Sequence, residues 1–108
     1  MIPFSEVLKT LPDCADIESI ELRGARGIVV AVIENKPGQS GSIRVYRTLL
    51  DRHGGSIDGP AAVEGLALYA EHTADARAQP GRHPNIDRLL AVAAGTEALH
   101  AVIRRRPG

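Results

Sequence analysis

The chain is short of aromatic residues and of cysteine, and each shortage excludes a class of structure. Three aromatic side chains and no tryptophan occur among 108 residues, so the core must be built from aliphatic side chains. Cys14 is the only cysteine, which excludes an internal disulfide. Asp13 and Asp16 flank it, and nearby carboxylates disfavour the thiolate that a nucleophilic cysteine requires. The sequence therefore points neither to a disulfide scaffold nor to a cysteine enzyme.

The chain also lacks a net charge and a long hydrophobic run. Its 13 Lys and Arg residues balance 13 Asp and Glu residues, so no electrostatic field attracts a polyanion, and we expect no nucleic-acid partner. The longest apolar run, residues 28–33, is far too short to cross a bilayer, and no secretory hydrophobic region follows Met1. We therefore expect no membrane partner and a cytoplasmic location, and the abundance of Ala, Arg and Gly is typical of a bacterial protein.

The length of the chain predicts a single domain, and its first element is a short helix. Apolar residues at positions 4, 7, 8 and 11 follow the helical spacing. Pro3 suits the first helical position, where a missing N–H costs nothing, and Pro12 ends the segment. A helix this short is marginal alone, so its apolar face must pack on another element.

Three runs typical of strands follow, at residues 18–23, 27–34 and 42–48. Apolar and polar residues alternate in the first and third runs, whereas the middle run is apolar on both faces. Alternation indicates one solvent-exposed face, and a continuous apolar run indicates two covered faces. Short connections favour pairing of sequence neighbours, so we predict an antiparallel three-stranded meander with residues 27–34 in its centre. That apolar strand needs a cover, either a helix from the second half or a second copy of the chain.

The second half of the chain predicts two helices. The first covers residues 58–77, opened by Asp-Gly-Pro and stopped by Gln-Pro-Gly at 79–81. The second starts at Asn85, a suitable N-cap residue, and ends near Gly95. Residues 98–105 fit a strand by alternation and a helix by alanine content, and we narrowly favour a fourth strand. The expected fold class is α+β: an N-terminal helix, the three-stranded antiparallel meander, two helices and this C-terminal strand.

The segment between residues 69 and 90 holds two of the four histidines and is the candidate site. His72 and Asp75 are three residues apart, so their side chains can meet on one helix face. Asp87 falls in the first turn of the second helix, where the helix dipole favours an anion. If the two helices fold back on each other, the polar side chains converge near the bend. The candidate ligand-binding residues are Tyr69, His72, Asp75, His83, Asn85 and Asp87.

This segment has a functional and a structural interpretation. Imidazoles beside carboxylates could bind a divalent metal or act as an acid–base pair near neutral pH. In the structural interpretation, which is the commoner outcome, Asn85 caps its helix, Asp87 offsets the dipole, His83 bonds a backbone carbonyl and His72 is solvated. The chain contains neither an HExxH motif nor a cysteine pair. We therefore assign no metal, no cofactor and no catalytic residue from the sequence.

Three other features have simpler structural explanations. The Gly-Gly-Ser-Ile-Asp-Gly loop at residues 54–59 lacks lysine and matches neither phosphate-binding glycine motif, so a turn is favoured over an anion site. No serine lies in a GxSxG elbow, so no catalytic triad is assigned. Five arginines are expected to pair with acids on the surface rather than to form an anion-binding patch: Arg23, Arg26, Arg44, Arg47 and Arg52.

The sequence His-Pro-Asn-Ile-Asp-Arg-Leu-Leu at residues 83–90 adds a resemblance. With the preceding helix and meander, it resembles a family of small bacterial proteins of unknown function. The resemblance covers most of the chain and rests mainly on this segment. It implies no activity, so no catalytic residue is transferred to this chain.

Two functional hypotheses follow. The first is a non-enzymatic module that acts through protein contacts, as a homo-oligomer or with another protein. The second is a domain that binds a small molecule or a metal through the polar segment from residue 69 to residue 87. Such a domain could also be an enzyme. The sequence favours the first, because the charge is neutral, one strand is apolar on both faces and a catalytic motif is lacking.

Overall fold

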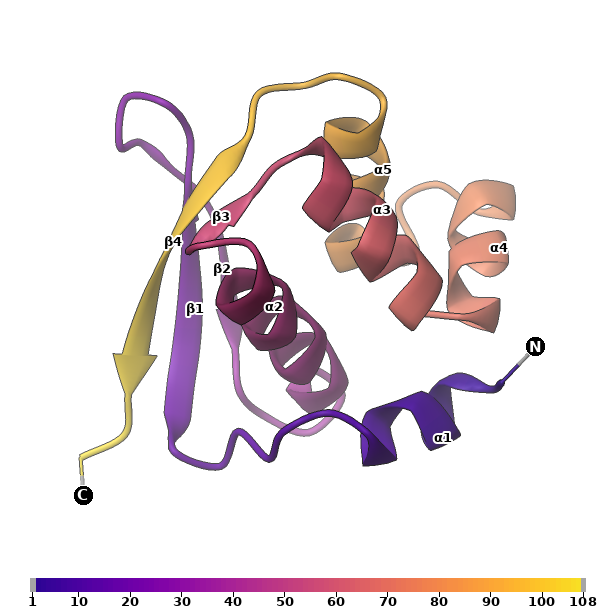
Figure 1. Cartoon of the computed structure of the whole chain (residues 1–108), viewed down its shortest axis with the longest axis horizontal. Coiled ribbons are helices and arrows are strands. Elements are labelled where there is room, and N and C mark those ends of the chain that lie inside the picture. The colour runs from indigo at the N-terminus through magenta and orange to yellow at the C-terminus, as the bar shows by residue number, and fades with distance from the viewer. Residues whose placement is uncertain (1, 108) are drawn as a thin grey trace.

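The computed structural model describes residues 2–107 and shows five helices on one side of a four-stranded antiparallel sheet (Figure 1). This arrangement confirms the predicted α+β class. None of the helices within residues 2–107 is long and apolar enough to cross a membrane. The elements in chain order are α1 (Phe4–Lys9), β1 (Ile17–Arg23), β2 (Val29–Glu34), α2 (Ser40–Arg52), β3 (Ser56–Ile57), α3 (Gly59–Leu68), α4 (Glu71–Ala78), α5 (Pro84–Ala93) and β4 (Leu99–Arg105).

The strand order in the sheet is β2-β1-β4-β3. β1 and β2 form the expected hairpin, and Ile20 opposes Ile33 across it. The C-terminal strand is confirmed: β4 returns antiparallel to β1, and Ile103 lies opposite Ile20 on the other side. β3 is a two-residue strand that pairs with the start of β4. Residues from the two ends of the chain therefore form the centre of the sheet.

Alternation along β1 determines which face of the sheet is covered. Ile20 and Leu22 are fully buried and point to the face that carries the helices. Glu21 lies between them on the other face, in register with Val32 of β2 and Val102 of β4. All helices lie on one side of the sheet in Figure 1, so this second face is open.

The prediction of a strand at residues 42–48 is wrong, because this segment lies within helix α2. Ile43 and Val45 suggested alternation, but Tyr46, Leu49 and Leu50 continue the pattern at helical spacing, and all five side chains are buried. Two apolar residues two positions apart do not distinguish a strand from a helix, and only a longer window of sequence does. The predicted meander is therefore a hairpin whose third strand comes from the C-terminus.

The central position predicted for residues 27–34 is also wrong, because β2 is an edge strand. Ile33 faces the helices and is buried, whereas Ile28, Val29, Val30 and Val32 are between 44% and 65% exposed. The continuous apolar run thus does not mark two covered faces. It leaves an exposed aliphatic surface, which we call the β2 edge (Ile28, Val29, Val30 and Val32).

The helix predicted for residues 58–77 is divided into α3 and α4. It begins as expected, since the Asp58 carboxylate accepts a hydrogen bond from the backbone N–H of Ala61 at 2.9 Å. The break falls at Ala70, whose φ of 54° is a conformation that residues with a side chain rarely adopt. α4, which contains His72, therefore leaves α3 at an angle (Figure 1).

Candidate functional site

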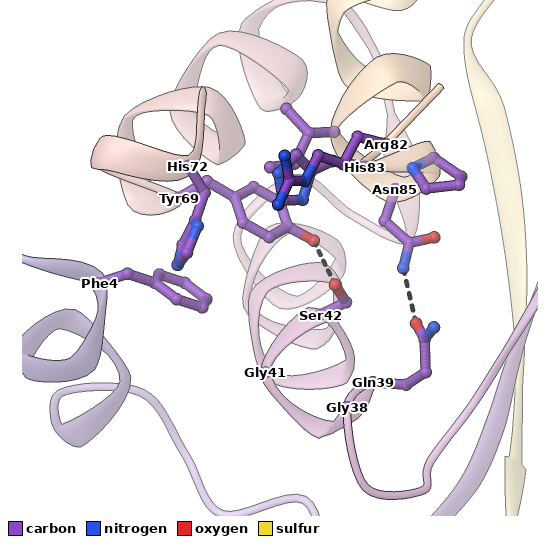
Figure 2. A pocket seen from close by; sticks show the side chains of 12 residues that line it. Phe4, Gly38, Gln39, Gly41, Ser42, Tyr69, His72, Arg82, His83 and Asn85 are labelled. Carbon is purple, nitrogen blue, oxygen red and sulfur yellow. Dashed lines mark hydrogen bonds between the residues drawn. The ribbon is translucent and has the colours of Figure 1, made fainter. Parts of the chain in front are cut away.

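A pocket of about 280 Å³ opens where α1, the start of α2, the α3–α4 break and the start of α5 meet (Figure 2). We call it the histidine pocket, after His72 and His83. It is lined by Phe4, Gly38, Gln39, Gly41, Ser42, Tyr69, His72, Arg82, His83, Pro84, Asn85 and Ile86.

Aromatic side chains form one wall of the histidine pocket. The Phe4 ring stacks on Tyr69 at a centroid distance of 5.4 Å and meets the His72 ring edge-on at 5.2 Å. A Cβ atom at Gly41 would lie 3.3 Å from the Phe4 ring, so the glycine leaves room for α1 to approach α2. The N-terminal helix thus contributes to a site that lies mainly between later elements.

A buried tyrosine pair lies beneath the pocket. Tyr69 donates a hydrogen bond from its hydroxyl to Ser42 Oγ at 2.7 Å (Figure 2). Burial raises the pKa of Tyr69, and burial also raises the pKa of Tyr46 to about 12, although Arg88 counteracts the rise at Tyr46. Both phenols are therefore neutral at physiological pH and act as hydrogen-bonding groups.

A chain of hydrogen bonds fixes the Asn85 side chain. Arg88 Nη1 donates to Asn85 Oδ1 at 3.0 Å and to Tyr46 Oη at 2.9 Å. Asn85 Nδ2 then donates to Gln39 Oε1 at 2.9 Å (Figure 2). Tyr46 Oη donates in turn to the Asn85 carbonyl at 2.6 Å. The start of α5 is thereby connected to α2 and to the loop that precedes it.

The two histidines differ in their partners. His83 Nε2 lies 2.6 Å from Asp75 Oδ2, so this carboxylate orients the imidazole. The His72 ring lies 5.8 Å from the His83 ring, centroid to centroid, and packs against Phe4. The hydrogen bond from His83 is the main reason why the pKa of Asp75 lies below its usual value, and Arg82 adds to the effect.

We expect Asp75 to make folding stability fall in mild acid. Its pKa is lower in the folded protein than in the unfolded chain, so its contribution is complete above the unfolded value of about 3.9 and is lost as pH falls through the folded value. Urea midpoints measured from pH 6 to pH 2 should decline less steeply in Asp75→Asn than in the wild type, with the difference developing below about pH 4. Parallel profiles would show that the His83 contact does not form.

The structure brings together some of the predicted site residues and not others. Tyr69, His72, His83 and Asn85 line the histidine pocket. Asp75 lies behind the wall and bonds His83 rather than its expected neighbour His72.

The expected roles of the α5 residues are corrected. Asp87 lies in the first turn of α5, as predicted, but it accepts from the backbone N–H of Gly81 at 2.9 Å instead of lining the pocket. The expected cap is also displaced, since α5 starts at Pro84 with His83 in the N-cap position. Asn85 is therefore free to take part in the side-chain network.

Sequence reasoning missed several lining residues, among them Phe4, Gln39, Ser42 and Arg82. Phe4, Gln39 and Ser42 lie outside the polar segment, and only the tertiary fold brings them to it, whereas Arg82 lies within the segment, in the loop between α4 and α5. A helical interpretation of residues 40–52 would have placed Ser42 in the first turn of a helix beside the Gly38–Gln39 loop.

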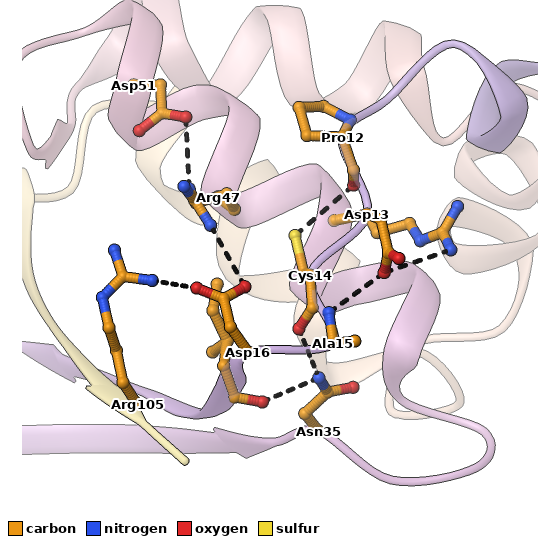
Figure 3. A network of polar contacts seen from close by, with 11 residues as sticks. Pro12, Asp13, Cys14, Ala15, Asp16, Asn35, Arg47, Asp51 and Arg105 are labelled. Carbon is orange, nitrogen blue, oxygen red and sulfur yellow. Dashed lines mark hydrogen bonds and ion pairs between the residues drawn. The ribbon is translucent and has the colours of Figure 1, made fainter. Parts of the chain in front are cut away.

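Outside the pocket, Cys14 is held as a thiol. Burial is the main cause of its raised pKa, and it outweighs the opposing effect of Arg47 and Arg44. The nearby Asp16 lies between Arg47 and Arg105, so it joins α2 to β4 (Figure 3). Burial, rather than the flanking carboxylates that the sequence suggested, is thus the leading cause of the raised pKa of Cys14.

The remaining candidates have structural partners. Acids pair with four of the five predicted arginines, through Arg23–Glu21, Arg44–Asp13, Arg47–Asp51 and Arg52–Glu64. Ser56 Oγ lies 3.2 Å from His100 Nδ1 across β3 and β4, on an exposed surface. Among residues 2–107, no three His, Cys, Asp or Glu side chains gather closely enough to hold a metal ion.

Comparison with other proteins places the chain in a family. The curated proteins and the solved structures gave no match. A family model described as "Uncharacterized protein conserved in bacteria (DUF2322)" matches residues 4–103. The expected resemblance to bacterial proteins of unknown function is confirmed at this level, and a diagnostic role for residues 83–90 stays a prediction. Since the match covers almost the whole chain, the protein belongs to this uncharacterised bacterial family.

Proposed function

We propose that this protein binds a small molecule in the histidine pocket. The supporting observation is convergence: four predicted residues meet Phe4, Gln39 and Ser42 around one cavity. Its volume of about 280 Å³ lies just below the range of about 300–1,000 Å³ that is typical of ligand sites. A ligand of metabolite size fits this cavity better than a dinucleotide does. The proposal concerns binding, and we assign no reaction to the pocket.

The test is a two-dimensional NMR titration of the labelled protein with a panel of metabolites, nucleotides, zinc and manganese. We expect one class of ligand to shift the signals of pocket residues only. His72→Ala should weaken this binding, whereas His100→Ala, a matched change on β4 outside the pocket, should not. A panel without localised shifts, or equal binding by both variants, would contradict the proposal.

A second candidate function is protein contact through the β2 edge. Val32 is 52% exposed and Val30 is 54% exposed, on a strand that has a neighbour on one side only. Edge strands with exposed aliphatic side chains readily pair with another strand. We take a second copy of this chain as the partner, because a molecule without net charge does not repel its own copies.

Sedimentation velocity tests the contact function. The wild type should sediment as a dimer at high concentration, and Val32→Lys should shift it toward the monomer because the ammonium group would be desolvated in the contact. Val63→Lys is the matched control, since Val63 is 60% exposed on α3, away from the β2 edge. A wild type that stays monomeric, or equal dimer in both variants, would exclude this use of β2.

A further inference from the structure

The hydrogen-bonding groups of the histidine pocket show which ligand chemistry it can satisfy. A polar site selects its ligand by the donors and acceptors that the protein leaves unused, because buried groups without a partner cost binding free energy. The relevant residues are Gln39, Ser42, Arg82 and Asn85, together with the two histidines.

Arg88 fixes the orientation of both amides at the pocket. A guanidinium can only donate, so the Asn85 atom that it contacts must be the oxygen. Asn85 therefore turns its NH₂ group toward Gln39, and the Gln39 side-chain oxygen must accept this hydrogen bond. The NH₂ group of Gln39 is left without a partner among the described residues. Both amide oxygens are used, and an amide donor remains available.

The other polar groups of the wall follow the same trend. Ser42 Oγ accepts from Tyr69, so the proton of the Ser42 hydroxyl is the group left to bond a ligand. Arg82 is 61% exposed, donates from Nη1 to Gln79 and has Nε 3.8 Å from Asp75 Oδ2, which leaves Nη2 as a guanidinium donor. The ring nitrogens of the two histidines that bond no described residue can donate or accept, according to the tautomer. The unused side-chain groups of Gln39 and Arg82 can thus only donate, and the Ser42 hydroxyl can add a further donor.

The charge of the wall agrees with this inventory. None of the described residues that line the pocket is an aspartate or a glutamate. Three acids close to the pocket are already used, since Asp75 bonds His83, Glu71 accepts from the backbone N–H of Phe4 and Asp87 accepts from the backbone N–H of Gly81. Opposite the polar groups, Phe4 and Ile86 offer apolar surface.

We infer that the histidine pocket takes a small organic anion, with a carboxylate or phosphate head on a compact apolar body. The head accepts hydrogen bonds from Gln39, Ser42 and Arg82, and the body packs against Phe4. This inference rests on the proposed ligand-binding function and adds the class of ligand. Charged acceptors form the stronger hydrogen bonds with such donors, and a guanidinium binds both kinds of head.

The experiment compares benzoate with benzamide, which has the same shape but no charge, and with phenyl phosphate. Binding to the full chain is followed by NMR titration at millimolar concentration. We expect benzoate or phenyl phosphate to bind at least about tenfold more tightly than benzamide, the ratio typical of one charge-assisted hydrogen bond. The stronger of the two anions identifies the preferred head group.

Two variants assign the effect to the pocket. Gln39→Glu keeps the oxygen that accepts from Asn85 and replaces the free NH₂ donor by a second carboxylate oxygen, so it should abolish the preference for the anion. Arg82→Gln should reduce anion affinity by about tenfold, whereas Arg77→Gln, a matched change on α4 outside the pocket, should leave it unchanged. Thermal unfolding checks that each variant is folded.

The outcomes distinguish a failure of the anion class from a failure of the proposed ligand-binding function. Equal binding of benzoate and benzamide would overturn the anion class while leaving ligand binding intact. The same holds if a neutral metabolite from the panel binds and none of the three probes does. If neither probes nor panel shift the pocket signals, both the anion class and the ligand-binding function fail.

Discussion

Leu89→Ala is expected to lower the free energy of unfolding by about 2–5 kcal/mol. Leu89 is fully buried on α5, where it packs against α3 close to Gly65. Removing its isobutyl group loses the transfer free energy of those atoms and leaves a cavity. The total stability of a domain is only about 5–15 kcal/mol, so this change removes a large fraction of it. Urea denaturation measures the effect.

The contact with Gly65 supplies an internal control. A Cβ atom at position 65 would lie 2.7 Å from Leu89 Cδ1 and 2.8 Å from Leu49 Cδ1. Gly65→Ala alone should therefore cost about 1–3 kcal/mol through overpacking. In the double variant the alanine methyl enters the space left by Leu89, so the loss should be smaller than the sum of the single losses. Additivity within about 0.5 kcal/mol would show that α3 and α5 do not pack this closely.

Tyr46→Phe is expected to destabilise the protein by about 1–3 kcal/mol, because a buried carbonyl and a guanidinium each lose a partner. The hydroxyl donates to the Asn85 carbonyl at 2.6 Å and accepts from Arg88 at 2.9 Å. The same change should loosen the Asn85–Gln39 hydrogen bond and broaden the NMR signals of both side-chain amides. Chemical denaturation and these amide signals test the two effects together.

Tyr69→Phe is the comparison for this variant. Tyr69 is also buried, but its hydroxyl has one partner, Ser42, which lines the pocket and can bond water when the phenol is removed. Its cost should therefore be about 0.5–1.5 kcal/mol, the range of an ordinary hydrogen bond. Equal losses in both variants would indicate that Arg88 and the Asn85 carbonyl find other partners.

The sequence predicted the fold class and the ends of the chain better than its middle. The helical spacing in the first element predicted a helix, and the alternation at residues 98–105 narrowly favoured a strand over a helix; both elements are present. Residues 42–48 failed because their apolar positions satisfy both periods. The helix pattern becomes clear only when Leu49 and Leu50 are included.

The position of β2 depends on information that local pattern does not hold. Val30 and Val32 are exposed because they lie on the face of the sheet that no helix covers. β2 is left at the edge because β4 pairs with the far side of β1. A segment 65 or more positions later in the chain thus decides the place of β2 in the sheet. Burial of a short apolar run cannot be derived from the run itself.

The candidate site was predicted in part for the same reason. Proximity in sequence identified His72, His83 and Asn85, which lie close together in the fold. The partner of His83 was predictable as an acid, but its identity as Asp75 depends on the turn between α4 and α5. Phe4 and Gln39 are distant in sequence from the polar segment, so only the tertiary structure shows that they line the pocket.

The place of β4 in the sheet also constrains how the chain folds during synthesis. Until residues 99–105 have emerged from the ribosome, β1 can pair only with β2, and β3 has no strand to pair with. The nascent protein therefore presents two unpaired strand edges and an incomplete core, which are the features that expose a chain to aggregation and to chaperones. The sheet of this domain can therefore be completed only after β4 has been synthesised.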